Sequence, residues 1–86
     1  MNGSEKQIKW ANDLKAETMT KVTELRKRFE ADAAKANVST SDPRYVDGIA
    51  IFDRCAANLE AKTEATWWIE NRSQVVDRMF VKRMSN

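Results

Sequence analysis

Hydrophobic and small side chains recur every three or four residues through the first part of the chain, which is the spacing of one face of an α-helix. These positions are Ile8, Ala11, Leu14, Thr18, Val22, Leu25, Phe29, Ala33 and Ala36. Ser4-Glu5-Lys6-Gln7 precedes them and has the form of a capping box, in which the first and last side chains bond each other's backbone N–H groups. No Gly or Pro interrupts the run, so the pattern predicts one long helix over 4–36.

A loop over 37–42 separates this helix from a second one. The sequence Asp42-Pro43 ends the loop in the arrangement expected at a helix start, with Asp as N-cap and Pro in the first turn. The next stripe consists of Tyr45, Ile49, Phe52, Ala56, Leu59 and Thr63 and continues to Thr66, Trp67 and Ile69. We therefore expect a second helix over 43–71, antiparallel to the first. Gly48 weakens a helix by about 1 kcal/mol relative to Ala, which predicts that another helix approaches closely there.

The stripe loses its register around Asn71-Arg72-Ser73. Beyond that point Val75, Val76, Met79, Phe80 and Met84 align on a face of their own. We expect a short third helix over 74–83, with Ser73 available as its cap. The predicted fold is all-α, a single domain over 1–86 built as a long antiparallel helical hairpin with a short C-terminal third helix.

The composition limits what can stabilise this fold. A core in a chain of 86 residues supplies only about 3–5 kcal/mol unless a disulfide, a metal or a second subunit adds to it. The single cysteine, Cys55, cannot form an intrachain disulfide, and the absence of histidine removes the usual zinc ligands. We expect no metal and no cofactor, and we expect a homodimer.

Groups suited to catalysis are scarce. Without histidine Cys55 has no ordinary base, and we expect it to be a buried structural thiol. Glu60 and Glu64 lie one helical turn apart and are interpreted as a solvated face rather than as an acid–base pair. Gly-rich phosphate-binding loops are missing from the sequence. We expect a protein that is not an enzyme.

The sequence shows no sign of membrane attachment. Its apolar stretches are only a few residues long, residues 1–6 carry no apolar run, and Asn2 stands where myristoylation needs Gly. We expect a cytoplasmic protein.

Tryptophan is the most distinctive feature of the second helix. Side chains that follow one another in a helix point about 100° apart, so Trp67, Trp68 and Ile69 cannot all face one core. Both tryptophans could be internal to three helices, or one could meet a second subunit or a binding partner. Trp10 should lie near this region in an antiparallel hairpin. The candidate residues for partner binding or dimerisation are Trp10, Trp67, Trp68 and Arg72.

Basic residues offer an alternative surface for DNA or RNA. Residues 1–37 carry 8 basic and 6 acidic side chains, 38–70 carry 3 and 6, and 71–86 carry 4 and 1. The nucleic-acid candidates are Lys21, Arg26, Lys27, Arg28, Arg78, Lys82 and Arg83. Acidic residues are interleaved with the first cluster, and no helix-turn-helix spacing is evident, so an ordinary solvated face is the favoured interpretation.

Two segments carry a resemblance. Both resemble motifs of small helical proteins from prophages and other mobile elements. The start S-x-K-Q-I-x-W-A of those proteins is similar to residues 3–11, Gly-Ser-Glu-Lys-Gln-Ile-Lys-Trp-Ala. Their motif A-x-W-W-I-[DE]-N-R is similar to residues 65–72, Ala-Thr-Trp-Trp-Ile-Glu-Asn-Arg. The resemblance covers about a fifth of the chain, and Ser73 to Asn86 lies outside it.

The resemblance implies a biological context rather than an activity. Small proteins of this kind commonly bind and block or recruit a host protein, and inhibition of a defence nuclease in the manner of anti-CRISPR proteins is one example. We expect a non-enzymatic phage or mobile-element protein that acts in a bacterial host by binding a macromolecule, with protein as the favoured partner and DNA or RNA as the alternative.

Overall fold

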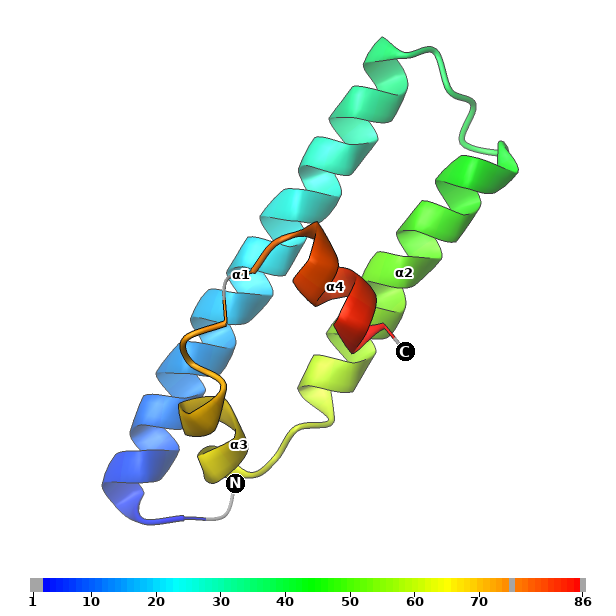
Figure 1. Cartoon of the computed structure of the whole chain (residues 1–86). Helices are drawn as coiled ribbons and strands as arrows, with labels where there is room; N and C mark the ends of the chain where they lie inside the picture. Colours follow the sequence, from blue (N-terminus) through cyan, green and yellow to red (C-terminus); the bar gives the residue numbers. More distant parts are fainter. Residues whose placement is uncertain (1–2, 75, 86) are drawn as a thin grey trace.

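The computed structural model describes residues 3–74 and 76–85. Its helices are α1 (Glu5–Lys35), α2 (Pro43–Glu60), α3 (Ala65–Glu70) and α4 (Arg78–Met84). Helices α1 and α2 are the antiparallel arms of a hairpin, α3 lies beside the first turns of α1, and α4 crosses between the arms (Figure 1). The principal dimensions are 49 × 19 × 16 Å. The predicted all-α hairpin with a short C-terminal helix is confirmed.

Local signals define both ends of α1. Ser4 Oγ accepts from the Gln7 N–H at 3.3 Å and Gln7 Oε1 accepts from the Ser4 N–H at 3.1 Å, which confirms the capping box. At the other end Asn37 has a φ of 57°, and the Val38 N–H donates to the Ala33 carbonyl at 2.9 Å. Asn tolerates this left-handed conformation and so terminates the helix there.

The start of α2 also follows the prediction. Asp42 accepts from the Arg44 N–H at 2.8 Å, and Pro43 occupies the first helical position. The close approach expected at Gly48 is confirmed, because a Cβ added there would lie 2.3 Å from Phe29 Cζ of α1. The glycine therefore gives space to an aromatic ring of the opposite arm.

The prediction of one helix over 43–71 is wrong beyond Glu60. In an unbroken helix Trp68 lies nine residues after Leu59, so at 100° per residue the two side chains would point in opposite directions. The break over 61–64 lets α3 turn, and Leu59 and Trp68 are then only 0% and 3% exposed. It also frees the Lys62 carbonyl, which accepts from Trp68 Nε1 at 2.9 Å.

The last helix begins later than predicted. It spans Arg78–Met84 rather than 74–83, because Asp77 rather than Ser73 caps it and accepts from the Phe80 N–H at 2.9 Å. The later start points Phe80 into the core and leaves Met79, placed on the apolar face by the sequence pattern, 81% exposed. Val75 lies outside the described residues.

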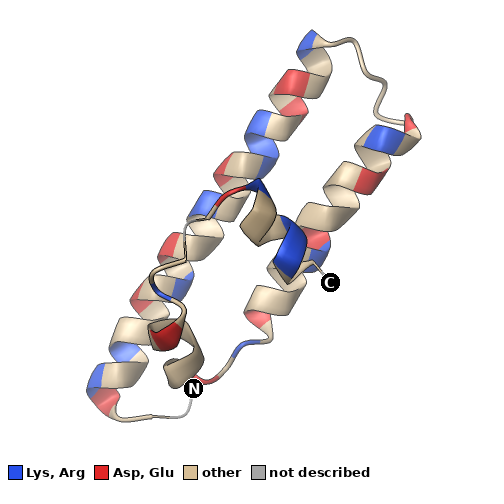
Figure 2. Ribbon diagram, viewed as in Figure 1, with Lys and Arg blue, Asp and Glu red and all other residues tan. Residues whose placement is uncertain are grey.

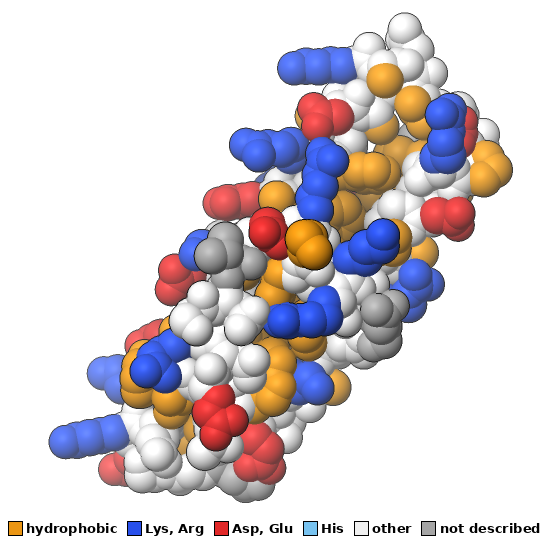
Figure 3. All heavy atoms as spheres, in the orientation of Figure 1, with side chains coloured by type: hydrophobic (Ala, Val, Ile, Leu, Met, Phe, Trp, Pro, Cys, Tyr) orange, Lys and Arg blue, Asp and Glu red, His pale blue; other side chains and the backbone are white. Residues whose placement is uncertain are grey.

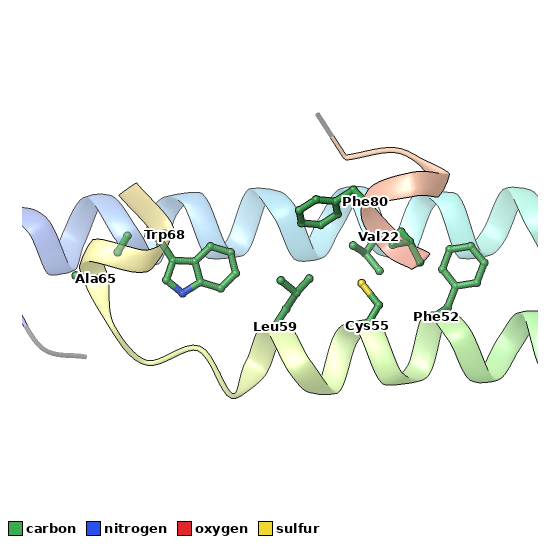
Figure 4. Close-up of a cluster of buried hydrophobic side chains, with 9 residues drawn as sticks. Val22, Phe52, Cys55, Leu59, Ala65, Trp68 and Phe80 are labelled. Carbon is green, nitrogen blue, oxygen red and sulfur yellow. The ribbon is translucent and has the colours of Figure 1, made fainter. Parts of the chain in front are cut away.

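One hydrophobic core joins the four helices. Its buried members are Ala11, Val22, Phe52, Cys55, Leu59, Ala65, Trp68, Phe80 and Val81. Leu59 points from α2 towards the space between Trp68 and Phe80 (Figure 4). Because α3 contacts α1 and α4 contacts α2, both short helices contribute side chains that the hairpin alone lacks. In the described part of the chain, no helix has the length and apolar character needed to cross a membrane.

Candidate binding groove

The two adjacent tryptophans have different environments. Trp68, one of the candidates for partner binding or dimerisation, is only 3% exposed and belongs to the core of the single chain, which does not fit a binding role for it. Trp67 is partly buried, and its ring meets that of Trp68 edge to face at a centroid separation of 4.8 Å. Lys62 Nζ lies 5.3 Å from the Trp67 ring centroid. Of the alternatives left open by the sequence, an internal position is therefore correct for Trp68 and only partly correct for Trp67.

Trp10 and Arg72 meet on the surface near α3. The Trp10 side chain is 45% exposed, and Arg72 Cζ lies 5.2 Å from its ring centroid. This geometry is a cation–π contact, worth about 0.5–1 kcal/mol at an exposed site. The expected proximity of Trp10 to the tryptophan motif is realised through Arg72. The nearest cavity, beside Trp67 and Arg72, holds only about 60 Å³ and is too small for an organic ligand.

A larger groove opens between the second half of α1 and the first half of α2. Its volume is about 870 Å³, and the first residues of α4 close one end of it. The apolar lining residues are Leu25, Phe29, Ala33, Val38, Tyr45, Ile51, Phe52, Val76 and Val81. The groove exists because α4 covers the middle of the hairpin and reaches no further towards the 37–42 loop (Figure 1).

Three aromatic rings organise the floor of the groove. Phe29 of α1 lies 5.8 Å from Tyr45 and 5.8 Å from Phe52 of α2, measured between ring centroids. Since Phe29 also packs against Gly48, its ring is held from the α2 side. Figure 3 shows hydrophobic side chains in the hollow between the upper parts of α1 and α2, with Lys and Arg side chains around it.

Charged residues line the groove beside its apolar floor, and most of them are basic. The cations are Arg28, Arg44, Arg78 and Lys82, and the acids are Asp32 and Asp77. Two of these six already have partners within the chain, since Asp77 caps α4 and Arg44 pairs with Asp42 at 3.1 Å. In the described part of the chain Arg28, Arg78 and Lys82 form no ion pair. The groove is therefore apolar at its base and positive along its edges.

The remaining nucleic-acid candidates do not join this surface. Arg26 bonds Asp53 at 2.6 Å and Glu30 at 3.3 Å, and Lys21 pairs with Glu17 at 3.3 Å. Along the length of α1, Lys and Arg alternate with Asp and Glu (Figure 2). The remaining two candidates, Lys27 and Arg83, do not line the groove, and Arg83 donates to Gln74 at 3.1 Å. The basic residues predicted as one set are therefore distributed over several faces.

The structure adds Phe29, Tyr45, Ile51 and Arg44 to the candidate site. A signal for two of them was present in the sequence, because Phe29 belongs to the apolar stripe of α1 and Tyr45 to that of α2. Their role as a groove rather than a core depends on where α4 lies. That position could not be derived from the spacing of apolar residues.

The residues that the sequence offered for chemistry, Cys55 and Glu60, lie outside the groove. Cys55 is fully buried in the core, and burial raises the pKa of its thiol, which suits the structural role expected for it. Glu60 Oε2 lies 3.4 Å from Lys15 Nζ, in an ion pair between α1 and α2. Within the described residues no cluster of three Cys, Asp or Glu side chains is suited to a metal ion. The geometry of the groove is that of an open apolar hollow with charged side chains beside it.

No protein-family model, no curated protein and no solved structure matches this chain.

Proposed function

We propose that this protein works without catalysis, by binding another protein in the groove between α1, α2 and the start of α4. The observation that carries the proposal is the floor formed by Phe29, Tyr45 and Phe52, which is open to a volume of about 870 Å³. These side chains would gain free energy if another apolar surface covered them, because burial removes their surface from water. Basic side chains along its edges would orient the partner and favour one charge type.

Protein is a better partner than nucleic acid for this surface. A phosphate-binding surface needs cations that follow a backbone, whereas only three of the seven predicted nucleic-acid residues, Arg28, Arg78 and Lys82, line the groove. Between them lies aliphatic and aromatic surface, which gains most by excluding water against another apolar face. DNA or RNA binding remains the alternative that the experiment below distinguishes.

The biological setting in this proposal comes from the two tryptophan-containing motifs. Their resemblance to prophage and mobile-element proteins supports a role in a bacterial cell, where the partner would be a host protein such as a defence nuclease.

The homodimer expected from the sequence would need a surface other than Trp68. Trp10, Val46 and Met79, which are 45%, 51% and 81% exposed, are the larger apolar side chains accessible for it.

A matched pair of variants tests the groove as the binding surface. Ala33→Glu places a charged side chain in the groove, whereas Ala31→Glu makes the same change at an exposed position of the same helix that does not line it. Each tagged protein is used to capture partners from a bacterial lysate, with and without nuclease treatment and at raised salt. We expect a protein retained by the wild type and by Ala31→Glu, resistant to nuclease and salt, and lost with Ala33→Glu.

The other outcomes would contradict the proposal in different ways. A partner retained equally by Ala33→Glu would show that binding occurs elsewhere on the molecule. Recovery that disappears with nuclease or salt would move the nucleic-acid alternative to first place.

A further inference from the structure

We propose that the groove receives a short amphipathic α-helix of the partner, about two turns long, with Asp or Glu beside its apolar face. This inference rests on the proposed function, because it names the partner segment that the same groove would bind. It follows from the size of the groove, from the packing of α4 and from the charge of the lining residues.

The dimensions of the groove suit a helix. Its lining on α1 runs from Leu25 to Ala33, eight steps of 1.5 Å or about 12 Å along the axis. A helical segment of that length and about 10 Å in diameter occupies roughly 900 Å³. The groove is an open hollow of about 870 Å³, so a segment of this size can be accommodated in it.

Helix α4 shows which kind of segment the hairpin accepts. It has seven residues, it lies between the two arms, and it buries Phe80 and Val81 while Lys82 and Arg83 stay exposed. The end wall of the groove is formed by Arg78, Val81 and Lys82 of α4, together with Val76 and Asp77 just before it. The groove is thus the continuation, towards the 37–42 loop, of a trough that already holds one short amphipathic helix. A partner helix would cover Phe29, Tyr45 and Ile51 as α4 covers the residues beside it.

The charges favour an acidic helix. Four cations line the groove against two acids. Arg44 is paired with Asp42 and Asp77 caps α4, so three cations and one acid, Asp32, remain. Asp or Glu flanking the apolar face of the partner would meet Arg28, Arg78 and Lys82, and a basic helix would be repelled. A second copy is disfavoured for the same reason, because its α4 would bring Arg78, Lys82 and Arg83 to a groove that is already positive.

Selection from a peptide library tests the chemistry of the partner directly. The probe is a displayed library of fully randomised 15-residue peptides, selected on the wild-type protein. Selected peptides are then measured by fluorescence anisotropy against the wild type, Ala33→Glu, Ala31→Glu, the double variant Arg28→Glu/Arg78→Glu and Lys27→Glu. Far-UV circular dichroism establishes that each variant is folded before it is used.

We expect selected peptides with apolar residues at i, i+3 or i+4, and i+7, flanked by Asp or Glu. Their affinity should fall at least about tenfold with Ala33→Glu and about tenfold with the double charge reversal. Ala31→Glu and Lys27→Glu should leave it unchanged, because neither residue lines the groove.

Selection of basic peptides, of peptides without helical spacing, or of none that Ala33→Glu weakens would overturn the inference. A concentration-dependent dimer in sedimentation that Ala33→Glu abolishes would identify a second copy as the occupant and would also overturn it. If a lysate partner needs the groove while the library yields only extended peptides, this inference fails and the proposed function stands. If lysate capture ignores Ala33→Glu, both fail.

Discussion

Replacement of Trp68 by alanine should remove most of the stability of the fold. The side chain is 3% exposed, meets the ring of Trp67 edge to face, and donates through Nε1 to the Lys62 carbonyl at 2.9 Å. Removing a buried tryptophan typically costs about 3–5 kcal/mol, because apolar contacts are lost and a cavity remains. That cost is as large as the roughly 3–5 kcal/mol that a core of this size supplies. Trp68→Ala should therefore be largely unfolded at 25 °C.

Trp10→Ala is the matched control, since it is the same substitution at a position that is 45% exposed. It removes the contact with Arg72 and should cost only about 0.5–1 kcal/mol. The free energy of unfolding is measured by urea titration with far-UV circular dichroism, at two protein concentrations that differ twentyfold. The loss in Trp68→Ala should be the same at both concentrations, because the burial is within one chain.

Two results would refute this reasoning. A loss below about 1 kcal/mol in Trp68→Ala, or one equal to that of Trp10→Ala, would mean that Trp68 is not a core residue. A stability that rises with protein concentration in the wild type and not in Trp68→Ala would place this tryptophan at a subunit contact instead.

Three further changes test local features of the fold. Gly48→Ala would press a methyl group against the Phe29 ring, so urea titration should show a loss instead of the gain of about 1 kcal/mol that alanine brings to an unhindered helix. Asp77→Ala removes the N-cap of α4 and should cost about 0.5–2 kcal/mol, with faster amide hydrogen exchange in α4 than in α1. Hydrogen bonding to Arg44 lowers the pKa of Asp42 from its usual 3.8. The stability that this carboxylate contributes is therefore present above pH 3.8 and is lost as the pH falls through the lowered pKa. Arg44→Gln should raise the pKa of Asp42 in an NMR titration, and an unchanged pKa would refute the pairing.

Short-range signals in the sequence were sufficient to define the hairpin. The capping box at Ser4, the uninterrupted periodicity to Lys35 and the Asp42-Pro43 start of α2 all act within a few residues, and the structure reproduces each. The close contact at Gly48 was also predictable, because a glycine inside a helix is costly without such a contact. These features depend on local hydrogen bonds and backbone geometry, which the neighbouring residues determine.

The break after Glu60 and the groove were decided by tertiary structure. The periodicity of α2 extends smoothly towards Thr66 and Trp67, and only the joint burial of Leu59 and Trp68 in one core makes an interrupted helix preferable. In the same way, the apolar residues that line the groove are visible in the sequence. Their spacing does not indicate that α4 leaves them uncovered. Burial depends on which distant segments meet, and the spacing of residues along one helix carries no information about that.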